Sequence, residues 1–169
     1  MTNETKADSR KHLRDIVSGF DTAMFVTYSG REALWSRPMS IAEVDADDVL
    51  YFATDVASAK VNQVKANPKA YVLLQNHKRW ASLRGSVRVL KDRQMIERLW
   101  SDAWKVWFPK GKDDPSLCLL AFDAEEGEYW DNSGANGLKY LLKAAKAYTR
   151  GARPVEDLTQ HGSAVLQSR

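Results

Sequence analysis

The sequence predicts a mainly β fold with peripheral helices, arranged as an antiparallel barrel or sandwich. Short runs rich in β-branched and aromatic residues recur along much of the chain, and tight polar turns separate most of them. Apolar residues at helical spacing are confined to segments that flank these runs. The 169 residues suffice for one core but not for two comfortable domains. We therefore expect one domain with six or seven mostly antiparallel strands.

The first part of the chain begins with an amphipathic helix and continues into a hairpin. Ser29-Gly30 is the turn signal of that hairpin, and Asn67-Pro68 ends a later helix. A polar turn at residues 45–48 precedes the third strand. In chain order, the expected elements are a helix at 8–20, strands at 23–28, 33–41 and 49–54, and a helix at 58–66.

The second part alternates strands with loops. Gly85 interrupts a long strand and predicts a bulge, whereas Glu126-Gly127 predicts a turn. From residue 149 the chain loses periodicity and gains Gly, Pro, Gln and Ser. We expect a single domain over residues 1–148 and a flexible tail over 149–169. The expected elements are strands at 70–75, 80–90, 117–123 and 128–131, helices at 92–103 and 136–148, and a loop at 109–115.

Composition narrows the functional classes. The net charge of +3 is small and spread out, which argues against nucleic-acid binding. No apolar run is long enough to cross a bilayer, and the polar N-terminal segment does not resemble a signal peptide. Cys118 is the only cysteine, and the histidines lack metal-ligand spacing. We therefore expect a cytoplasmic protein without a metal site or membrane partner.

The segment from Thr54 to Lys60 is the strongest candidate for a binding site. A buried strand stops here at a polar turn that opens a helix, and Ser58 is suited to the N-cap position. The first turn of a helix presents unpaired N–H groups, to which Thr54 and Ser58 add hydroxyls and Lys60 a cation. This combination suits a phosphate dianion. Ordinary helix capping explains the same residues without any ligand.

A second cation strengthens the phosphate interpretation. Pro38 follows Arg37 in the second strand, and a proline cannot donate a ladder hydrogen bond, so this strand lies at an edge or beside a ligand. We expect that strand to neighbour residues 49–54, which would bring Arg37 close to Lys60. Two cations at one helix N-terminus bind a phosphate better than either alone. The alternative is an exposed arginine on an edge strand.

Taken together, these motifs resemble the FMN-binding split barrels, the relatives of pyridoxamine 5′-phosphate oxidase, and in particular their general stress protein branch. The resemblance covers residues 9–148 and is carried by several motifs in order. They are Ser36-Arg37-Pro38-Met39, Tyr51-Phe52-Ala53-Thr54-Asp55, Ser58, Lys60, Asn67-Pro68, Leu99-Trp100, Trp107-Phe108-Pro109-Lys110-Gly111, Asp113-Asp114-Pro115 and Glu128-Tyr129-Trp130.

The resemblance implies a split β-barrel with FMN as cofactor and assigns roles to individual residues. Arg37 and Lys60 would hold the FMN phosphate, aided by Ser58. A second group would lie along the rest of the flavin. Pro38 and Met39 would run beside the isoalloxazine, and Thr54 and Asp55 would contact the ribityl chain or the ring.

The resemblance also implies a homodimer with the flavin between the two subunits. Trp107 and Trp130 are the candidates for the wall contributed by the partner, although either indole would also suit a core position. Residues 131–137 contain neither the Arg nor the His that helps the oxidase bind pyridoxal phosphate substrates. The flavin site is thus expected without vitamin B6 oxidase activity.

Three functions fit this reading. The first is an FMN-dependent oxidoreductase that acts on an unidentified small molecule, with no catalytic acid or base evident. The second is a dimer that binds, buffers or senses flavin without turnover. In the third, a deazaflavin or haem replaces FMN, but the Arg37, Ser58 and Lys60 cradle favours a terminal phosphate and hence FMN.

Overall fold

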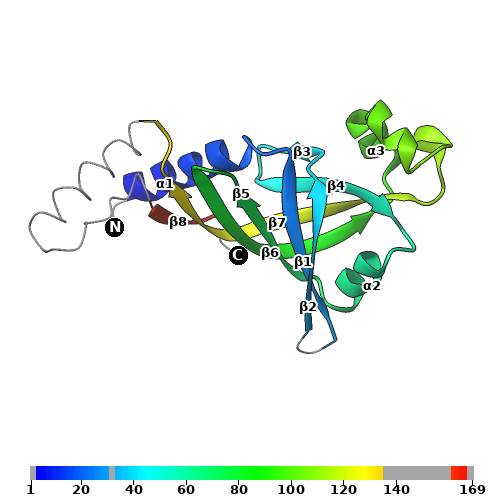
Figure 1. The fold of residues 1–169 in the computed structure, drawn as a ribbon, viewed down its shortest axis with the longest axis horizontal. Coiled ribbons are helices and arrows are strands. Elements are labelled where there is room, and N and C mark those ends of the chain that lie inside the picture. The colour runs from blue at the N-terminus through cyan, green and yellow to red at the C-terminus, as the bar shows by residue number, and fades with distance from the viewer. Residues whose placement is uncertain (1–2, 31–32, 135–160, 167–169) are drawn as a thin grey trace, which may run out of the picture.

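The computed structural model describes residues 3–30, 33–134 and 161–166, and these form one antiparallel sheet with helices around it (Figure 1). The strands are β1 (Thr22–Ser29), β2 (Ala33–Ser40), β3 (Glu43–Val44), β4 (Val49–Asp55), β5 (Lys69–Gln75), β6 (Arg79–Leu90), β7 (Leu117–Asp131) and β8 (His161–Val165). The helices are α1 (Asn3–Val17), α2 (Ala59–Ala66) and α3 (Arg93–Leu99), with 3₁₀ turns η1 (Asp102–Val106) and η2 (Gly111–Asp113).

The sheet curls so that its two ends approach each other without closing. Its strand order is β2-β1-β5-β6-β7-β4-β3, and β8 pairs with β7 beside this path. Residues 41 and 42 join the two ends, because the Ile41 N–H donates to the Asp21 carbonyl (2.9 Å) and the Ala42 N–H to the Tyr51 carbonyl (2.7 Å). The antiparallel split-barrel architecture expected from the sequence is confirmed.

β2 confirms the edge position predicted from Pro38, because its ladder partner is β1. The expected proximity of β2 to residues 49–54 does not come from strand pairing. β4 pairs with β3 and β7, and it approaches β2 only through the curl of the sheet.

The core has two parts, one on each face of β4 and β7. The larger part lies between the sheet and α1 and α2, where Phe25 packs edge-on against Phe52 with 5.2 Å between ring centroids. The smaller part is centred on Ile96 and Leu99 of α3. Burial on both faces explains why residues 117–122 form a continuous apolar run instead of an alternating one.

Gly127 does not mark a turn, because β7 continues through it as one strand. A Cβ at this position would lie 2.6 Å from Leu13 Cδ2 and 2.7 Å from Leu83 Cδ2. The glycine is therefore required for the close approach of α1 to the sheet. The bulge predicted at Gly85 is confirmed, since the β6–β7 register shifts between Arg84 and Gly85.

The expected flexible tail does not extend over residues 161–166. β8 pairs with β7 from Glu126 to Trp130, and the Leu166 N–H donates to the Glu125 carbonyl (2.8 Å). β4 pairs only with the first half of β7, so the second half offers an open edge that β8 occupies. Residues 149–160 and 167–169 of the predicted tail, and the predicted helix 136–148, lie outside the described residues.

The segment expected as one helix at 92–103 is divided. Asp92 caps α3 by accepting from the Met95 N–H (3.0 Å), and the helix ends at Leu99. Ser101 then accepts from the Ala103 N–H (3.4 Å) and opens η1. A second capping residue inside the segment restarts the chain in a new direction. The short strand β3 was not anticipated.

α1 is fastened to the β3–β4 turn by a buried carboxylate. The Asp48 side chain is 5% exposed and accepts from Arg10 Nε (2.9 Å) and Arg14 Nε (2.6 Å). Its φ of 65° lies in the left-handed region, which aspartate tolerates better than most residues. The hydrogen bond to Asp48 raises the pKa of Arg14 above its ordinary value.

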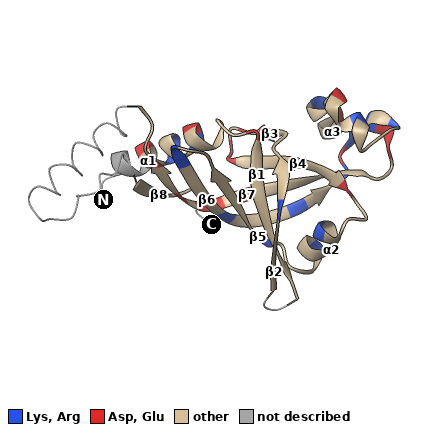
Figure 2. Ribbon diagram, viewed as in Figure 1, with Lys and Arg blue, Asp and Glu red and all other residues tan. Residues whose placement is uncertain are grey.

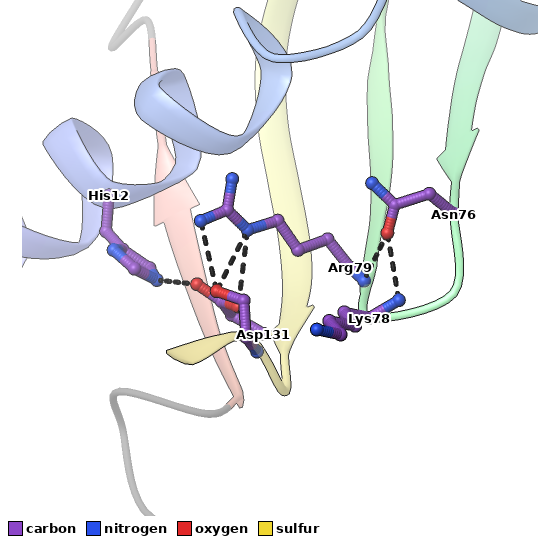
Figure 3. Close-up of polar contacts among 6 residues, drawn as sticks. His12, Asn76, Lys78, Arg79 and Asp131 are labelled. Carbon is purple, nitrogen blue, oxygen red and sulfur yellow. Dashed lines mark hydrogen bonds and ion pairs between the residues drawn. The ribbon is translucent and has the colours of Figure 1, made fainter. Parts of the chain in front are cut away.

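A second buried carboxylate fastens α1 to the other end of the sheet (Figure 3). His12 Nε2 lies 3.2 Å from Asp131 Oδ2, and Arg79 Nε lies 3.4 Å from Asp131 Oδ1. Asn76 shapes the adjacent β5–β6 turn by accepting from the Arg79 N–H (2.8 Å). Burial raises the pKa of Asp131, but the hydrogen bonds from Ser133 and the neighbouring positive charges leave it below its ordinary value.

Within the described residues, no helix has the length and apolar character needed to span a bilayer. No group of three potential metal-ligating side chains is found in the same part of the chain.

Candidate functional site

A cavity of about 800 Å³ opens between β2, the end of β4, the start of α2 and the η1 segment. This volume is typical of a small-molecule or cofactor site. Residues from chain segments far apart in sequence line it because the curl of the sheet brings β2 opposite β4. The predicted site residues on its wall are Arg37, Pro38, Met39, Thr54, Asp55, Lys60 and Trp107.

Arg37 is held at the cavity wall by neutral oxygen acceptors. Its Nη1 donates to Thr27 Oγ1 (2.6 Å), and its Nη2 donates to Gln63 Oε1 (2.9 Å). Thr27 in turn donates to Gln63 Oε1 (2.6 Å), so β1, β2 and α2 share one hydrogen-bond network. This network orients the guanidinium without neutralising its charge. The contribution of Gln63 was not predicted, because a glutamine on a helix carries no distinctive sequence signal.

Lys60 lies in the first turn of α2 and donates from Nζ to Thr54 Oγ1 (3.0 Å). Ser58 is the N-cap residue as predicted, but its hydroxyl makes no capping hydrogen bond. Its Oγ lies 3.5 Å from Thr54 Oγ1. Ser58 is therefore a neighbour of the cavity wall whose hydroxyl is not committed to the helix. The first turn of α2 contains no acidic residue, which preserves the positive end of the helix dipole.

Asp55 positions the turn that leads into α2. Its Oδ1 accepts from the Ala57 N–H (2.6 Å), and its carbonyl accepts from the Ser58 N–H (3.1 Å). Such an Asx turn reverses the chain compactly after β4. The carboxylate is thus part of the local fold as well as of the cavity wall.

The charge of the Arg37 and Lys60 pair is not compensated by ion pairs. No carboxylate lies within ion-pair distance of either side chain among the residues that the structure describes. Burial lowers the pKa of Arg37, and burial together with the nearby Arg37 charge lowers the pKa of Lys60. Two half-buried, mutually repelling cations beside the hydroxyls of Thr54 and Ser58 are the arrangement expected of an anion site. Figure 2 shows basic residues in blue on β2 and on α2.

The cavity also has an aromatic wall, which is formed by η1 and the two residues that follow it and which we call the η1 wall. Trp107 is 69% exposed, and Trp104 and Phe108 lie beside it on the cavity surface. Trp104 packs edge-on against Trp100 with 5.7 Å between ring centroids, which anchors the segment. Trp104 was not singled out as a site residue. The one sequence signal that includes Trp104 is the high number of tryptophans, six in 169 residues.

Trp130 lies outside this cavity. It is on the opposite face of the sheet from α1, where the indole stacks on the His161 ring with centroids 4.8 Å apart and an interplanar angle of 8°. Together with Met24, Leu73 and Trp80 it borders a second cavity of about 460 Å³. Within a single chain, the predicted site residues therefore line one cavity, with the exceptions of Trp130 and of Ser58, which lies next to Thr54 of the lining. The predicted role of Trp130 in a partner's site stays a prediction.

Comparison with solved structures identifies several similar chains. A general stress FMN/FAD-binding protein from Xanthomonas citri is 28% identical and covers 79% of this chain and 92% of its own, with a TM-score of 0.62. A structure described as a general stress protein 26 of a Jannaschia species is 26% identical, covers 94% of this chain and 99% of its own, and has a TM-score of 0.73. A pyridoxamine 5′-phosphate oxidase-related FMN-binding protein from Nostoc punctiforme is 17% identical, covers 98% and 96%, and shares the fold with a TM-score of 0.58.

No curated protein sequence matches the chain. A family model, by contrast, matches residues 8–155, which include the whole cavity wall described above. That model describes proteins like pyridoxamine 5′-phosphate oxidase. The match extends over most of the chain and agrees with the split-barrel fold of the similar structures. The chain belongs to the pyridoxamine 5′-phosphate oxidase-like family.

Proposed function

We propose that this protein is an FMN-binding general stress protein, and that it works as an FMN-dependent oxidoreductase on a small molecule. The observation that carries the proposal is the unneutralised pair of cations, Arg37 and Lys60, at one end of a cavity with an aromatic wall. A phosphate monoester satisfies the cations, and a flat ring system suits the tryptophans. Both properties are combined in FMN. The flavin-binding protein of Xanthomonas citri supports the same assignment.

Each residue of the cavity has a part in this proposal. Arg37, pre-oriented by Thr27 and Gln63, donates to the phosphate, and Lys60 donates from the opposite side. The Ser58 hydroxyl and the first turn of α2 supply further donors. Thr54 aligns Lys60 through the 3.0 Å contact. Other residues lie along the remainder of the cofactor: Pro38 and Met39 along the isoalloxazine, and Asp55 along the ribityl chain.

FMN supplies the redox chemistry when it is bound, by exchanging hydride with a substrate stacked on its ring. The protein orients the cofactor, excludes water with the η1 wall and sets the electrostatic field around it. No cavity residue is required as an acid or base for a hydride exchange of this kind. The absence of Arg and His from residues 131–134, together with the sequence of 135–137, continues to argue against vitamin B6 oxidase activity.

We further propose that two copies form a homodimer through the outer face of the sheet. Two cross-strand rows of this face lie side by side in the register, one running Gln75–Trp80–Trp130–His161 and the other Met24–Leu73–Ser82. Met24, Leu73 and Trp130 are exposed large apolar side chains on this face. Exposed apolar surface of this kind marks interaction sites. In such a dimer Trp130 would reach the partner's flavin.

The phosphate assignment is tested by measuring FMN affinity of the apoprotein by fluorescence titration. Arg37→Ala and Lys60→Ala each remove a charge-assisted hydrogen bond, which is on the order of 1.5–3 kcal/mol or about tenfold to a hundredfold in affinity. Lys65→Ala is the matched control, because Lys65 is an exposed lysine on the same helix outside the cavity. If neither cavity variant weakens binding, the phosphate does not bind here.

Turnover is tested separately with the FMN-loaded protein. Loss of the flavin absorbance on addition of NADH or NADPH, without another reductase, would select the oxidoreductase. A loaded protein that no reduced nicotinamide bleaches would select the alternative, a flavin-buffering or flavin-sensing dimer. Mass measurement by light scattering tests the dimer, and Leu73→Glu is expected to convert it to monomers.

A further inference from the structure

We propose that the end of the cavity opposite the cations binds the positively charged, planar heteroaromatic ring of a substrate, and that Asp21 determines this charge preference. The inference rests on the proposed FMN site and names the class of substrate that the site accepts. It is carried by the position of Asp21, by the aromatic side chains that line the same cavity, and by the charge balance of the cavity.

Asp21 lies at the far end of the cavity from Arg37. Both residues line the same cavity. Thr22 pairs with Ser40 and Phe25 with Arg37 in the β1–β2 ladder, so the Asp21 end is displaced along β2 by at least three residues, or about 10 Å. The 41–42 segment fixes this end, because the Ile41 N–H donates to the Asp21 carbonyl (2.9 Å). A phosphate held by Arg37 therefore leaves the Asp21 end for other parts of the ligands.

The Asp21 carboxylate is available to a ligand. The side chain belongs to an exposed residue on the cavity wall. No hydrogen bond or ion pair engages its carboxylate within residues 3–30, 33–134 and 161–166. The other acid on the wall, Asp55, already accepts from the Ala57 N–H (2.6 Å). Asp21 is consequently the carboxylate best placed to meet a ligand.

The charge balance of the loaded cavity favours a cation. A bound phosphate monoester carries close to two negative charges near pH 7, which offset the charges of Arg37 and Lys60. The remaining formal charges on the wall are those of Asp21 and Asp55. The loaded cavity is therefore net negative, and a second anionic ligand would be repelled.

The aromatic wall specifies the shape of the cation. Trp104 and Trp107 present indole surface to the same cavity as Asp21, and Trp107 is 69% exposed. A cation over an indole face is attracted by the ring quadrupole, and a flat ring also gains stacking area. A carboxylate and two indoles around one space together select a planar cation, such as a pyridinium or a protonated heteroaromatic amine.

The test compares two probes that differ in ring charge and by one methyl group, using the FMN-loaded protein. 1-Methylnicotinamide carries a positive ring and nicotinamide a neutral one, and calorimetric titration gives a dissociation constant for each. The wild-type protein should bind the cation more tightly. Asp21→Asn should reduce this preference about two- to fivefold, the range of a partly exposed ion pair. Asp47→Asn, which removes an exposed acid outside the cavity, should leave it unchanged.

The aromatic contribution has its own pair of variants. Trp107→Leu should lower the cation preference, and Trp107→Phe should restore most of it, because a phenyl face retains part of the quadrupole. Oxidised nicotinamide mononucleotide distinguishes two sources of such a ring. Tighter binding than the methyl probe indicates a nucleotide-borne pyridinium, and weaker binding a free heteroaromatic cation.

Two results would overturn the inference. One is a wild-type protein that binds nicotinamide as tightly as its methylated cation. The other is an Asp21→Asn protein with an unchanged preference, or with weakened FMN binding instead. FMN affinity is measured on the same samples, so failure of the FMN site appears separately as a protein that does not take up the cofactor at all.

Discussion

Two pairs of basic side chains in this molecule are placed in opposite electrostatic situations. Arg10 and Arg14 of α1 share the buried carboxylate of Asp48 at 2.9 and 2.6 Å. Arg37 and Lys60 of the cavity are held by Thr27, Gln63 and Thr54, which are neutral acceptors. The first pair has a counter-ion within the chain, whereas the positive charge of the second pair is not balanced by a carboxylate among the described residues.

The difference separates a structural role from a binding role. A half-buried cation without a counter-ion loses part of its hydration and gains no ion pair, so it costs stability in the free protein. The direction of the Lys60 pKa agrees with this cost, because burial and the Arg37 charge both lower it. A bound anion supplies the missing counter-charge and so offsets this loss of stability. Removing the first pair should therefore damage the fold, and removing the second should damage binding only.

The largest expected effect is on stability, from removing both partners of Asp48. Arg10→Met combined with Arg14→Met leaves a buried carboxylate uncompensated and should lower the free energy of unfolding by about 3 kcal/mol. Urea unfolding of the apoprotein measures this. Arg84→Met is the control, since Arg84 and Glu126 form a half-exposed pair that should contribute little. Equal stability of the double variant and the wild type would refute a structural role for the pair.

A second prediction concerns packing beneath α1. Gly127→Ala places a methyl group 2.6 Å from Leu13 Cδ2 and should destabilise the protein by about 1–3 kcal/mol through overpacking. Ala103→Val adds carbon at an exposed position on the cavity wall and should leave the melting temperature nearly unchanged. Equal losses in both variants would show that the cavity is packed as tightly as the α1 side.

Acid titration provides a third prediction on the α1 side. The pKa of Asp131 lies below its ordinary 3.8, so its ionised form stabilises the folded state fully above that pH. This contribution is lost as the pH falls through the lowered pKa. The wild type should therefore exceed Asp131→Asn in stability at pH 7, and the gap should narrow below about pH 4. Thermal melts over this range report it, and a constant gap would contradict the assignment.

The smallest expected effect belongs to Lys60. The charge of Lys60 destabilises the folded apoprotein, whereas the charge of Asp131 stabilises it. The pKa of Lys60 in the folded apoprotein lies below 10.5, so the unfolded chain binds more protons between the two values. The stability of the wild-type apoprotein relative to Lys60→Met should therefore rise as the pH approaches 10.5. FMN affinity should fall over the same range as Lys60 loses its proton. Denaturation of the apoprotein and titration with FMN at matched pH values test these two trends. The assignment is contradicted if stability and FMN affinity both rise or both fall as the pH increases.

The sequence predicted the fold class and part of the cavity wall, including Arg37, Thr54 and Lys60, because local patterns indicate both. The strand-to-helix turn at Thr54–Lys60 and the edge proline Pro38 fall where the patterns predict. The reason for the meeting of Arg37 and Lys60 was not predictable, since the curl of the sheet brings β2 opposite β4 without pairing them. Local periodicity contains no information about such curvature.

The misses have a common physical cause. Gly127 was interpreted as a turn, but the glycine is needed because α1 packs closely on β7. β8 was assigned to a flexible tail, but it forms because half of the β7 edge is free. Asp21 and Trp104 were overlooked as cavity residues, and Gln63 as the acceptor of Arg37, because only tertiary structure brings them there. In each case a contact between distant segments decided the outcome.

The most direct test of the central claim is a crossed measurement on two double variants. FMN affinity and apoprotein unfolding are measured for Arg37→Met/Lys60→Met and for Arg10→Met/Arg14→Met. We expect the first to lose FMN affinity by a hundredfold or more, on the order of two charge-assisted hydrogen bonds, while its unfolding free energy stays equal or rises. The second should lose stability and keep its FMN affinity at temperatures where it is folded. The account is contradicted if the cavity variant still binds FMN normally, or if it loses stability as severely as the α1 variant.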